Sequence, residues 1–289
     1  MNILTIQSQV SYGHVGNSAA VFALQRIGCE AWPVPTVLLS NHPGYGASRG
    51  APVDPSLIRA NIEGVAAIGA LARCDGVLTG YLGAAEVGEA ALDAARRVRG
   101  LNPRALWCCD PVMGDNGRVY ARPGVVEFVR DRAAPEADIL TPNLFELELL
   151  AGAQISSLDD AAAAMRALAL RGARAVVVTS FDRETPADAL DTLALDATGL
   201  WRVRVRRAPR SFEGAGDLFS ALFFAAYLER RAGGEALASA AARVAGVLTR
   251  TQAEGTRELA LIAAQEELAR PTLAVEAERL GPGPGEAAR

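Results

Sequence analysis

The sequence predicts an α/β fold: a three-layer α/β/α sandwich with a mostly parallel central sheet and an antiparallel hairpin at its edge. Short apolar runs alternate with helix-like segments along the first 180 residues, and polar residues follow directly after most of the runs. Such alternation requires right-handed crossovers, which place parallel strands side by side and helices on both faces of the sheet.

Eight apolar runs have the lengths and residue types of β-strands. The last two flank residues 196–199 and predict an antiparallel hairpin, which we expect at a sheet edge. The runs are 2–8, 30–38, 74–80, 105–110, 137–143, 173–180, 189–195 and 200–205.

Helix-like segments separate the first six strands, and three more follow the hairpin. No linker divides the chain, so we expect one domain over residues 1–270. The tail 271–289 ends in GPGPGEAAR, cannot form a core, and is predicted to be disordered. The helical segments are 15–27, 55–71, 84–99, 124–133, 143–150, 158–170, 217–231, 234–250 and 256–269.

Composition excludes several classes of function. The 289 residues are half hydrophobic, enough for a sizeable core, and the net charge of −4 provides no field to attract nucleic acid or an anionic membrane. The longest apolar run is about a dozen residues, short of the ~20 that span a bilayer. The start MNILTIQSQ lacks the basic flank of a secretory signal. Four cysteines without C-x-x-C spacing predict buried, reduced thiols, so we expect a cytoplasmic protein.

Polar residues at the predicted strand ends indicate where the function lies. In an open α/β sheet, ligands bind beyond the carboxyl ends of the strands. The residues found there are Ser8, Gly80–Tyr81, Asp110–Asp115, Thr141–Glu146 and Thr179–Ser180.

Two acidic motifs occupy these ends, and each allows two interpretations. DPVMGD (110–115) places Asp110 and Asp115 around a turn, which suits Mg²⁺ but also suits an Asx-type turn directed by Pro111. TPNLFELELL (141–150) puts Glu146 in the first turn of a helix, where acids favour the helix dipole without any further role. If Glu146 approaches Asp110, the two carboxylates repel each other and a metal ion would offset that repulsion.

The stretch GAGD, residues 214–217, opens an almost wholly apolar helix. Glycine permits a turn with positive φ, and the first amides of a helix can hold phosphate oxygens. Asp217 could instead be an N-cap that contributes about 1 kcal/mol to helix stability. Taken alone, this motif favours the N-cap.

Six motifs in a fixed order point to a family. SYGHVGNSAA (11–20), SNHPGYG (40–46), GYLG (80–83), DPVMGD, TPNLFELELL and FEGAGDLFSAL (212–222) together resemble the pyridoxal kinases of the ribokinase-like superfamily. The resemblance runs from residue 2 to about residue 270. It implies a ribokinase-like fold that transfers the γ-phosphoryl group of ATP to the 5′-hydroxymethyl group of pyridoxal, pyridoxine or pyridoxamine in vitamin B6 salvage.

The resemblance also implies roles on the phosphate side. Asp217 matches the catalytic base, and Gly214, Ala215 and Gly216 match the anion hole for the transferring phosphoryl group. Asp110 and Glu146 match the positions that handle Mg²⁺ with ATP, with Asp115 and Thr141 nearby. Thr179 matches a nucleotide contact, and the loop 205–211 lies along the adenosine, which brings in Val205, Arg206, Arg207 and Ala208.

On the vitamin side, Ser8 matches a hydrogen-bonding partner of the pyridine ring and Tyr81 an aromatic that packs on it. His42, Pro43 and Gly44 belong to the loop that covers the substrate, and residues 116–122 match a flap that closes over ATP. Relatives commonly carry Thr at the position of Pro43, so the resemblance leaves the preferred vitamer open. It further implies a homodimer and leaves room for a monovalent cation such as K⁺.

Two alternatives to a pyridoxal kinase come with the resemblance. One is a hydroxymethylpyrimidine kinase, although the motif SYGHVGNSAA differs from the Gly-rich SDPSGGAG-like opening usual in those enzymes. The other is a B6-binding protein with vestigial kinase activity, suggested by Pro43 and opposed by the intact Asp217.

Overall fold

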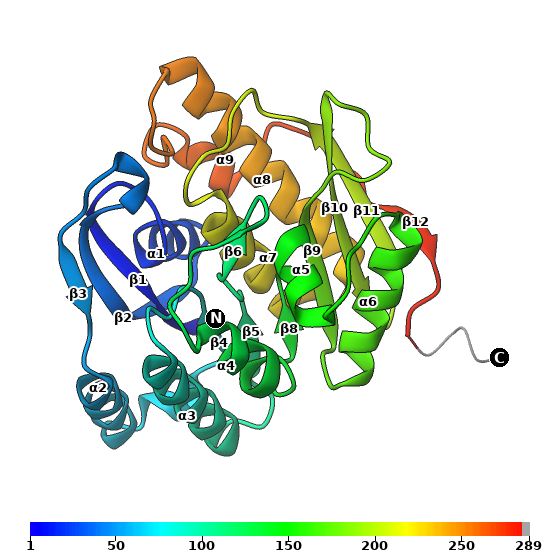
Figure 1. Ribbon diagram of the computed structural model, residues 1–289. Helices are drawn as coiled ribbons and strands as arrows, with labels where there is room; N and C mark the ends of the chain where they lie inside the picture. The colour runs from blue at the N-terminus through cyan, green and yellow to red at the C-terminus, as the bar shows by residue number, and fades with distance from the viewer. Residues whose placement is uncertain (285–289) are drawn as a thin grey trace.

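A computed structural model describes residues 1–284, and residues 285–289 lie outside the description. Within the described residues the main sheet has ten strands in the order β12-β11-β10-β9-β8-β5-β4-β1-β2-β3 (Figure 1). Its strands are β1 Asn2–Tyr12, β2 Glu30–Asn41, β3 Gly50–Pro52, β4 Gly76–Thr79, β5 Leu106–Cys109, β8 Ile139–Leu140, β9 Ala175–Phe181, β10 Ala189–Asp196, β11 Gly199–Arg206 and β12 Glu278–Gly281.

The central strands are parallel, which confirms the predicted fold class. Parallel pairing runs without interruption from β2 through β1, β4, β5 and β8 to β9, and the hairpin β10–β11 joins β9 in antiparallel fashion. The chain leaves β1 toward β2 on one side and returns to β4 on the other. This reversal of strand order creates a crevice at the carboxyl ends of β1 and β4.

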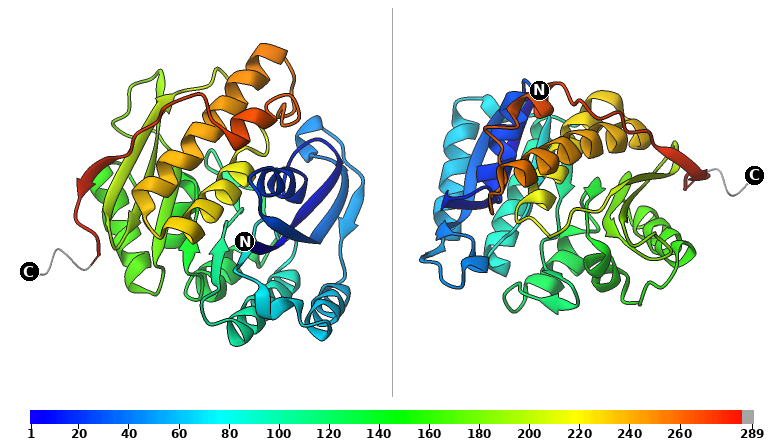
Figure 2. Two further views of the ribbon diagram at one scale, coloured as in Figure 1. Left: turned by 180° about the vertical axis from the view of Figure 1, so that it is seen from behind. Right: turned by 90° about the horizontal axis from the view of Figure 1, so that it is seen from above.

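Helices cover both faces of the sheet in two separate groups (Figure 2). Residues alternate along each strand, so Trp107 and Cys109 of β5 pack into one core while Leu106 and Cys108 pack into the other. One face carries α1 Asn17–Arg26, α7 Ala215–Arg230, α8 Gly233–Glu254 and α9 Gln265–Ala269. The other carries α2 Pro55–Ala67, α3 Ala85–Leu101, α4 Val125–Phe128, α5 Leu144–Ala151 and α6 Leu158–Leu170.

Helix α7 is the most deeply buried helix of its layer. Every residue from Leu218 to Leu228 is buried, and the helix packs against both α1 and α8. Phe219, Phe223 and Tyr227 stack along one side at ring distances of 6.1 and 5.8 Å. This packing holds the amino end of α7 in a fixed position. Among residues 1–284, no helix is both long and apolar enough to cross a membrane.

The prediction of a helix over residues 256–269 is wrong for most of its length. Helix α8 ends at Glu254, and Gly255 follows in the left-handed conformation with φ 65°. A left-handed glycine after the last turn ends a helix. Beyond Gly255 the chain continues in a series of turns, and only Gln265–Ala269 of the predicted segment is helical.

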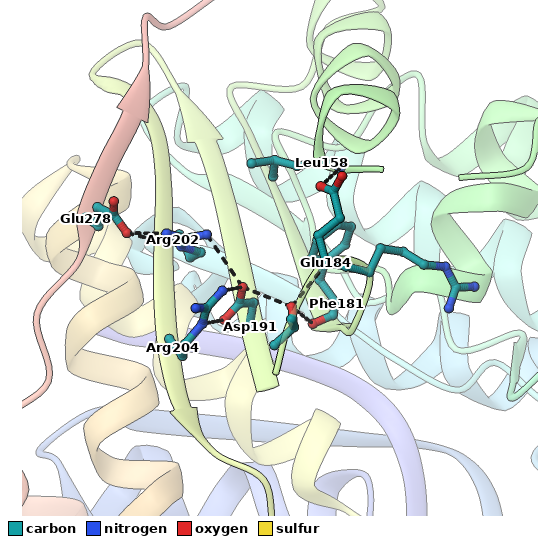
Figure 3. A network of polar contacts seen from close by, with 9 residues as sticks. Leu158, Phe181, Glu184, Asp191, Arg202, Arg204 and Glu278 are labelled. Carbon is teal, nitrogen blue, oxygen red and sulfur yellow. Dashed lines mark hydrogen bonds and ion pairs between the residues drawn. The ribbon is translucent and has the colours of Figure 1, made fainter. Parts of the chain in front are cut away.

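The predicted disorder of the tail 271–289 is wrong for the described residues 278–281. They form strand β12, which pairs with β11 and becomes the sheet edge, so the hairpin lies one strand further in. On β11, Arg202 pairs with Glu278 at 2.6 Å and lies 3.9 Å from the buried Asp191 of β10. Arg204 donates two hydrogen bonds to Asp191, at 2.6 and 2.7 Å (Figure 3). An unpaired strand edge together with a fixed guanidinium attracts this segment, whose own composition is typical of a flexible tail.

Candidate active site at the carboxyl ends of the strands

Backbone ladders bring the predicted site residues to one edge of the sheet. The N–H of Asp110 donates to Thr79 at the end of β4, and the N–H of Thr141 donates to Cys109 at the end of β5. The same pattern continues one strand further, where Thr179 and Asn143 form a parallel bridge. The residues after β4, β5, β8 and β9 are therefore neighbours, as the strand-end argument predicts.

Asp110 and Glu146 are both buried, with exposed fractions of 7% and 3%. Burial raises the pKa of Asp110 well above its ordinary value, and the charges of Glu146 and Asp217 add to this rise. In the described part of the chain no arginine pairs with these carboxylates, and the sequence contains no lysine. The cluster is thus short of positive charge, which a bound cation would supply.

Glu146 is held by backbone amides at the start of α5. Its carboxylate accepts hydrogen bonds from the N–H groups of Met113 at 2.8 Å, Gly114 at 3.3 Å and Asn143 at 2.9 Å. Asn143 in turn accepts from the N–H of Glu146, which completes a capping box. Burial raises the pKa of Glu146 to about 7, although these three bonds oppose the rise. Glu146 therefore caps the start of α5 and also lies close enough to Asp110 for the two carboxylates to repel each other.

These residues fit a magnesium ion. Mg²⁺ keeps several waters and binds one or two carboxylates together with phosphate oxygens. Asp110 and Glu146 supply two oxygen donors, and no group of three or more His, Cys, Asp or Glu side chains suited to a metal occurs in residues 1–284. These two carboxylates are therefore better suited to an ion that is also bound by phosphate oxygens than to a metal held by protein side chains alone.

Asp217 lies in the first turn of α7, three residues after the left-handed Gly214 that precedes the helix. Gly214 has φ 81°, and a Cβ atom at this position would lie 1.9 Å from the carbonyl oxygen of His14. The N–H of Ala215 donates to Phe212, while those of Gly216 and Asp217 have no acceptor among residues 1–284. Two adjacent free amides at the start of a helix can hold phosphate oxygens.

The carboxylate of Asp217 faces the glycine-rich loop 13–16. Gly16 has φ 54°, and the proximity of its backbone N–H lowers the pKa of the Asp217 carboxyl. Burial raises the pKa of Asp217 above its ordinary value, while the neighbouring His42 lowers it. Asp217 is therefore a stronger base than an exposed aspartate. Its side chain makes no N-cap hydrogen bond, so the interpretation of Asp217 as only an N-cap is wrong.

The predicted vitamin-binding residues lie on or directly after β1, β2 and β4. Ser8 is buried on β1, and a Cβ atom at Gly16 would touch its hydroxyl. Tyr81 is half-buried after β4, with its carbonyl fixed by Thr36 at 2.6 Å. Pro43 is the first residue of a short 3-10 turn, Pro43–Tyr45. An N–H at this position would have no partner within the turn, so proline fits there.

His42 caps that turn and reaches toward α7. Its Nδ1 accepts a hydrogen bond from the N–H of Gly44 at 3.0 Å, and its Nε2 lies 3.6 Å from Glu213 Oε2. His42, Pro43 and Gly44, which were predicted to cover the substrate, thus lie in and before one turn. This turn is close to Glu213, the residue that precedes Gly214.

The predicted nucleotide residues divide between a strand and a loop. Thr179 is half-buried in β9, beside Asn143. Val205 and Arg206 lie within β11 and not in the loop expected over 205–211. Arg207 follows, donating to Ala189 at 3.1 Å, and Ala208 lies beyond it.

The flap predicted over 116–122 begins at the turn of a small hairpin, which joins β6 Gly114–Asp115 to β7 Arg118–Val119. Asn116 and Gly117 have φ 50° and 76°, the positive values that a tight two-residue turn requires. Asp115 is exposed and accepts a hydrogen bond from the N–H of Asn116 at 2.8 Å, and its charge adds to the rise in the pKa of Glu146.

Two residues near the carboxylates escaped the sequence analysis. Ser220 donates a hydrogen bond to Asp110, and three-residue spacing from Asp217 on a helix could have revealed it. The pKa of Tyr120 in the flap is raised, mainly by burial. The negative charges of Glu146, Asp110 and Asp217 raise it further. No pattern in the sequence identifies Tyr120.

Comparison with known proteins agrees with this geometry. Residues 11–259 match the family model described as phosphomethylpyrimidine kinase. Pyridoxal kinase PdxY of Rubrobacter xylanophilus is 46% identical over 97% of this chain and 98% of its own length. PdxY of Granulibacter bethesdensis is 47% identical over 94% and 97%.

Among solved structures, a pyridoxal kinase from Leishmania donovani in complex with ADP and pyridoxamine matches with a TM-score of 0.89. It is 30% identical and aligns over 96% of this chain and 99% of the other. The parallel sheet, the strand-end carboxylates and the near full-length similarity lead to one conclusion: the chain belongs to the pyridoxal kinase family.

Proposed function

We propose that the protein transfers the γ-phosphoryl group of ATP to the 5′-hydroxymethyl group of pyridoxal, and of pyridoxine and pyridoxamine, to give the 5′-phosphate. The observation that carries this proposal is the arrangement at the start of α7. There a half-buried carboxylate, Asp217, follows a left-handed Gly214 and free helix amides, and the buried pair Asp110 and Glu146 faces it.

Asp217 acts as the base in this proposal. The substrate hydroxyl oxygen forms a bond to the γ-phosphorus while the bond from that phosphorus to the bridging oxygen breaks, and ADP leaves. The hydroxyl proton passes to the Asp217 carboxylate as the new bond forms. A raised pKa brings Asp217 closer to the range in which a base is effective, and a loose transition state requires the proton transfer only late.

Backbone amides stabilise the charge that develops on the transferring group. Gly214, Ala215 and Gly216 form the turn at the amino end of α7, and the free N–H of Gly216 is directed by the helix. Because α7 is buried along its length, these amides need not reorganise during the reaction.

Asp110 and Glu146 would hold Mg²⁺, directly or through water, with Thr141 close by. When bound, the ion neutralises phosphate charge and bridges phosphate oxygens. Asp115, Thr179 and the segment Val205, Arg206, Arg207 and Ala208 would contact the nucleotide, and the flap would exclude water from it. A dependence on a monovalent cation such as K⁺ is tested by comparing rates in potassium and tetramethylammonium salts.

Ser8 and Tyr81 would bind the pyridine ring, one by a hydrogen bond and the other by packing. His42, Pro43 and Gly44 would cover it. Proline gives the loop a fixed start but no side-chain donor at that position, so ring contacts from the loop fall to its neighbours.

The test compares wild type with Asp217→Ala and Asp217→Asn. With Mg²⁺ and ATP, wild type should form pyridoxal 5′-phosphate, and each variant should lose at least about 10²-fold in kcat. Asp159→Asn, at an exposed site on α6, is the matched control and should retain full activity. Absence of turnover with all three vitamers contradicts the proposal, and vitamer binding without ATP consumption would instead indicate a B6-binding protein.

A second candidate is a kinase for a hydroxymethylpyrimidine, which the description of the matching family model favours. The hydroxymethyl group and the planar ring are common to both substrates, so the base and the anion hole would act in the same way. Comparing kcat/KM for the pyrimidine alcohol and for pyridoxal separates the two candidates, and we expect pyridoxal to be preferred.

We also propose that the protein is a cytoplasmic homodimer. Tyr12 and Leu38, on neighbouring strands β1 and β2, are 62% and 51% exposed, which is high for large apolar side chains. The four cysteines are free and buried, in keeping with a reducing compartment. Light scattering of the purified protein and cell fractionation test the two statements.

A further inference from the structure

We infer that Glu258 is a positioning residue that holds the substrate loop, residues 42–46, against the loop supporting Asp217. The inference rests on the proposed function, because it assigns the loop a vitamer to cover. Glu258 lies in the turns between α8 and α9, the segment wrongly predicted to be helical, and it is half-buried.

The carboxylate of Glu258 joins two segments that are far apart in the chain. Its Oε1 accepts a hydrogen bond from the Tyr45 hydroxyl at 2.7 Å, and its Oε2 accepts from the N–H of His14 at 2.9 Å. The donors are 213 and 244 residues away in sequence. Each carboxylate oxygen therefore has a different loop as its partner.

Arg257 reinforces the contact with the substrate loop. Its guanidinium lies 3.9 Å from the centre of the Tyr45 ring and donates a hydrogen bond to the carbonyl of Gly44. A guanidinium over an aromatic face is attractive, and the hydrogen bond fixes the backbone of the same turn. Neighbouring residues 257 and 258 thus hold both the side chain and the backbone of the loop.

The His14 side of the contact leads to the catalytic groups. Gly13 has φ 99°, and a Cβ atom there would lie 2.3 Å from Glu258 Oε2, so only glycine permits the approach of the carboxylate. The carbonyl of His14 packs against Gly214, and the backbone N–H of Gly16 is near enough to Asp217 to lower the pKa of its carboxyl. The loop that Glu258 holds is therefore the one that touches the anion hole and the base.

The substrate loop has a second attachment to the same region. The N–H of Gly44 donates to His42 Nδ1, so in the neutral ring the proton is on Nε2, which lies 3.6 Å from Glu213. Glu213 directly precedes Gly214. Glu258 thus contacts Tyr45 of the substrate loop and Glu213 lies near His42 of the same loop, and both contacts lead to the turn at Gly214.

This arrangement predicts which kinetic constant changes. A loop already held in its closed position loses less conformational freedom when the vitamer binds. Loss of Glu258 should therefore weaken vitamer binding, whereas ATP is held by other elements. A purely structural role would lower stability and affect both substrates equally.

The experiment compares Tyr45→Phe, Glu258→Gln and the double variant with wild type. Each single variant should raise KM for pyridoxal about 3- to 10-fold, as expected for one hydrogen bond, and leave KM for ATP within twofold. The double variant should be no worse than the more affected single variant. Glu254→Gln, which breaks an exposed pair with Arg250 in the last turn of α8, is the matched control and should match wild type.

Hydrogen exchange gives a readout that needs no substrate. The amides of Tyr45 and Gly46 donate within the turn to His42 and Pro43, and they should exchange faster in Glu258→Gln than in wild type or Glu254→Gln. Unchanged exchange, or an unchanged KM for pyridoxal, overturns the inference. A wild type that phosphorylates no vitamer contradicts the proposed function instead, and the exchange result still tests the anchoring.

Discussion

The hydroxyl of Ser220 donates a hydrogen bond to Asp110 Oδ2 at 2.9 Å, across 110 residues of sequence. The hydroxyl of Thr141 lies 2.9 Å from the same Ser220 oxygen. A serine has one proton to donate, so Thr141 is the donor in the second bond. These two bonds fasten α7, and with it Asp217, to the carboxyl ends of β5 and β8.

Ser220→Ala should weaken this connection. The buried Asp110 loses the one hydroxyl donor that it has among residues 1–284, and the free energy of unfolding should fall by about 1–3 kcal/mol. The kcat should also fall, because α7, which carries Asp217, is no longer held in position relative to Asp110 and Glu146. Denaturant unfolding and steady-state kinetics measure the two effects. Ser239→Ala on α8 is the kinetic control, and equal activity of the two variants would contradict the prediction.

Gly214→Ala should disrupt the anion hole. The new Cβ atom would lie 1.9 Å from the carbonyl of His14 at a positive φ, so the turn must move. We expect a loss of at least about 10²-fold in kcat and about 1–3 kcal/mol of stability. Gly100→Ala provides the contrast, since that exposed helical site has open space and the change should stabilise by about 0.5–1 kcal/mol. Normal turnover by Gly214→Ala would show that the turn is not part of the site.

Glu146 should make the nucleotide-free protein less stable as pH rises. Its folded pKa, about 7, is above the ordinary 4.5, so the folded state holds the proton more tightly than the unfolded state. The stabilisation is fully present below about pH 4.5 and is lost as the pH rises through about 7. Thermal unfolding with a chelator between pH 5 and 8 measures it. Glu146→Gln should flatten the curve, and an identical slope in the variant would exclude this assignment.

Asp191 and Glu278 should differ in their contributions to stability. Asp191 is 1% exposed and accepts from Arg204, whereas the Glu278 side chain is 61% exposed. Asp191→Asn should cost about 1–3 kcal/mol, because it leaves buried hydrogen-bonding groups poorly matched. Glu278→Gln should cost less than about 1 kcal/mol, as exposed ion pairs do. Denaturant midpoints compare them, and a larger loss for Glu278→Gln would contradict the ranking.

The predicted sequence of strands and helices agrees with the structure wherever local pattern is strong. The run ALWCCD reads as a strand, and its alternate residues do separate into the two cores. Strand β12, which the sequence analysis missed, depends on a partner far away in the chain. Strand β12 forms because β11 has an open edge and Arg202 attracts Glu278, while its own composition favours a flexible tail.

The candidate site shows the same division. Strand-end geometry was enough to bring Asp110 and Glu146 together, and glycine spacing identified the turn before Asp217. The sequence could not reveal that Ser220 joins α7 to Asp110, nor that Glu258 holds the substrate loop.

Hydrophobic period, turn residues and caps are set by neighbours within a few positions, so the α/β class, the strand ends and the GAGD turn can all be read along the chain. The contacts of Glu258 with residues 213 and 244 positions away form only after the sheet and α7 have brought these segments together. Periodicity carries no information about such pairs, because many side chains of equal polarity could take their places. Tertiary packing alone selects Glu258, Ser220 and β12 for the positions that they occupy.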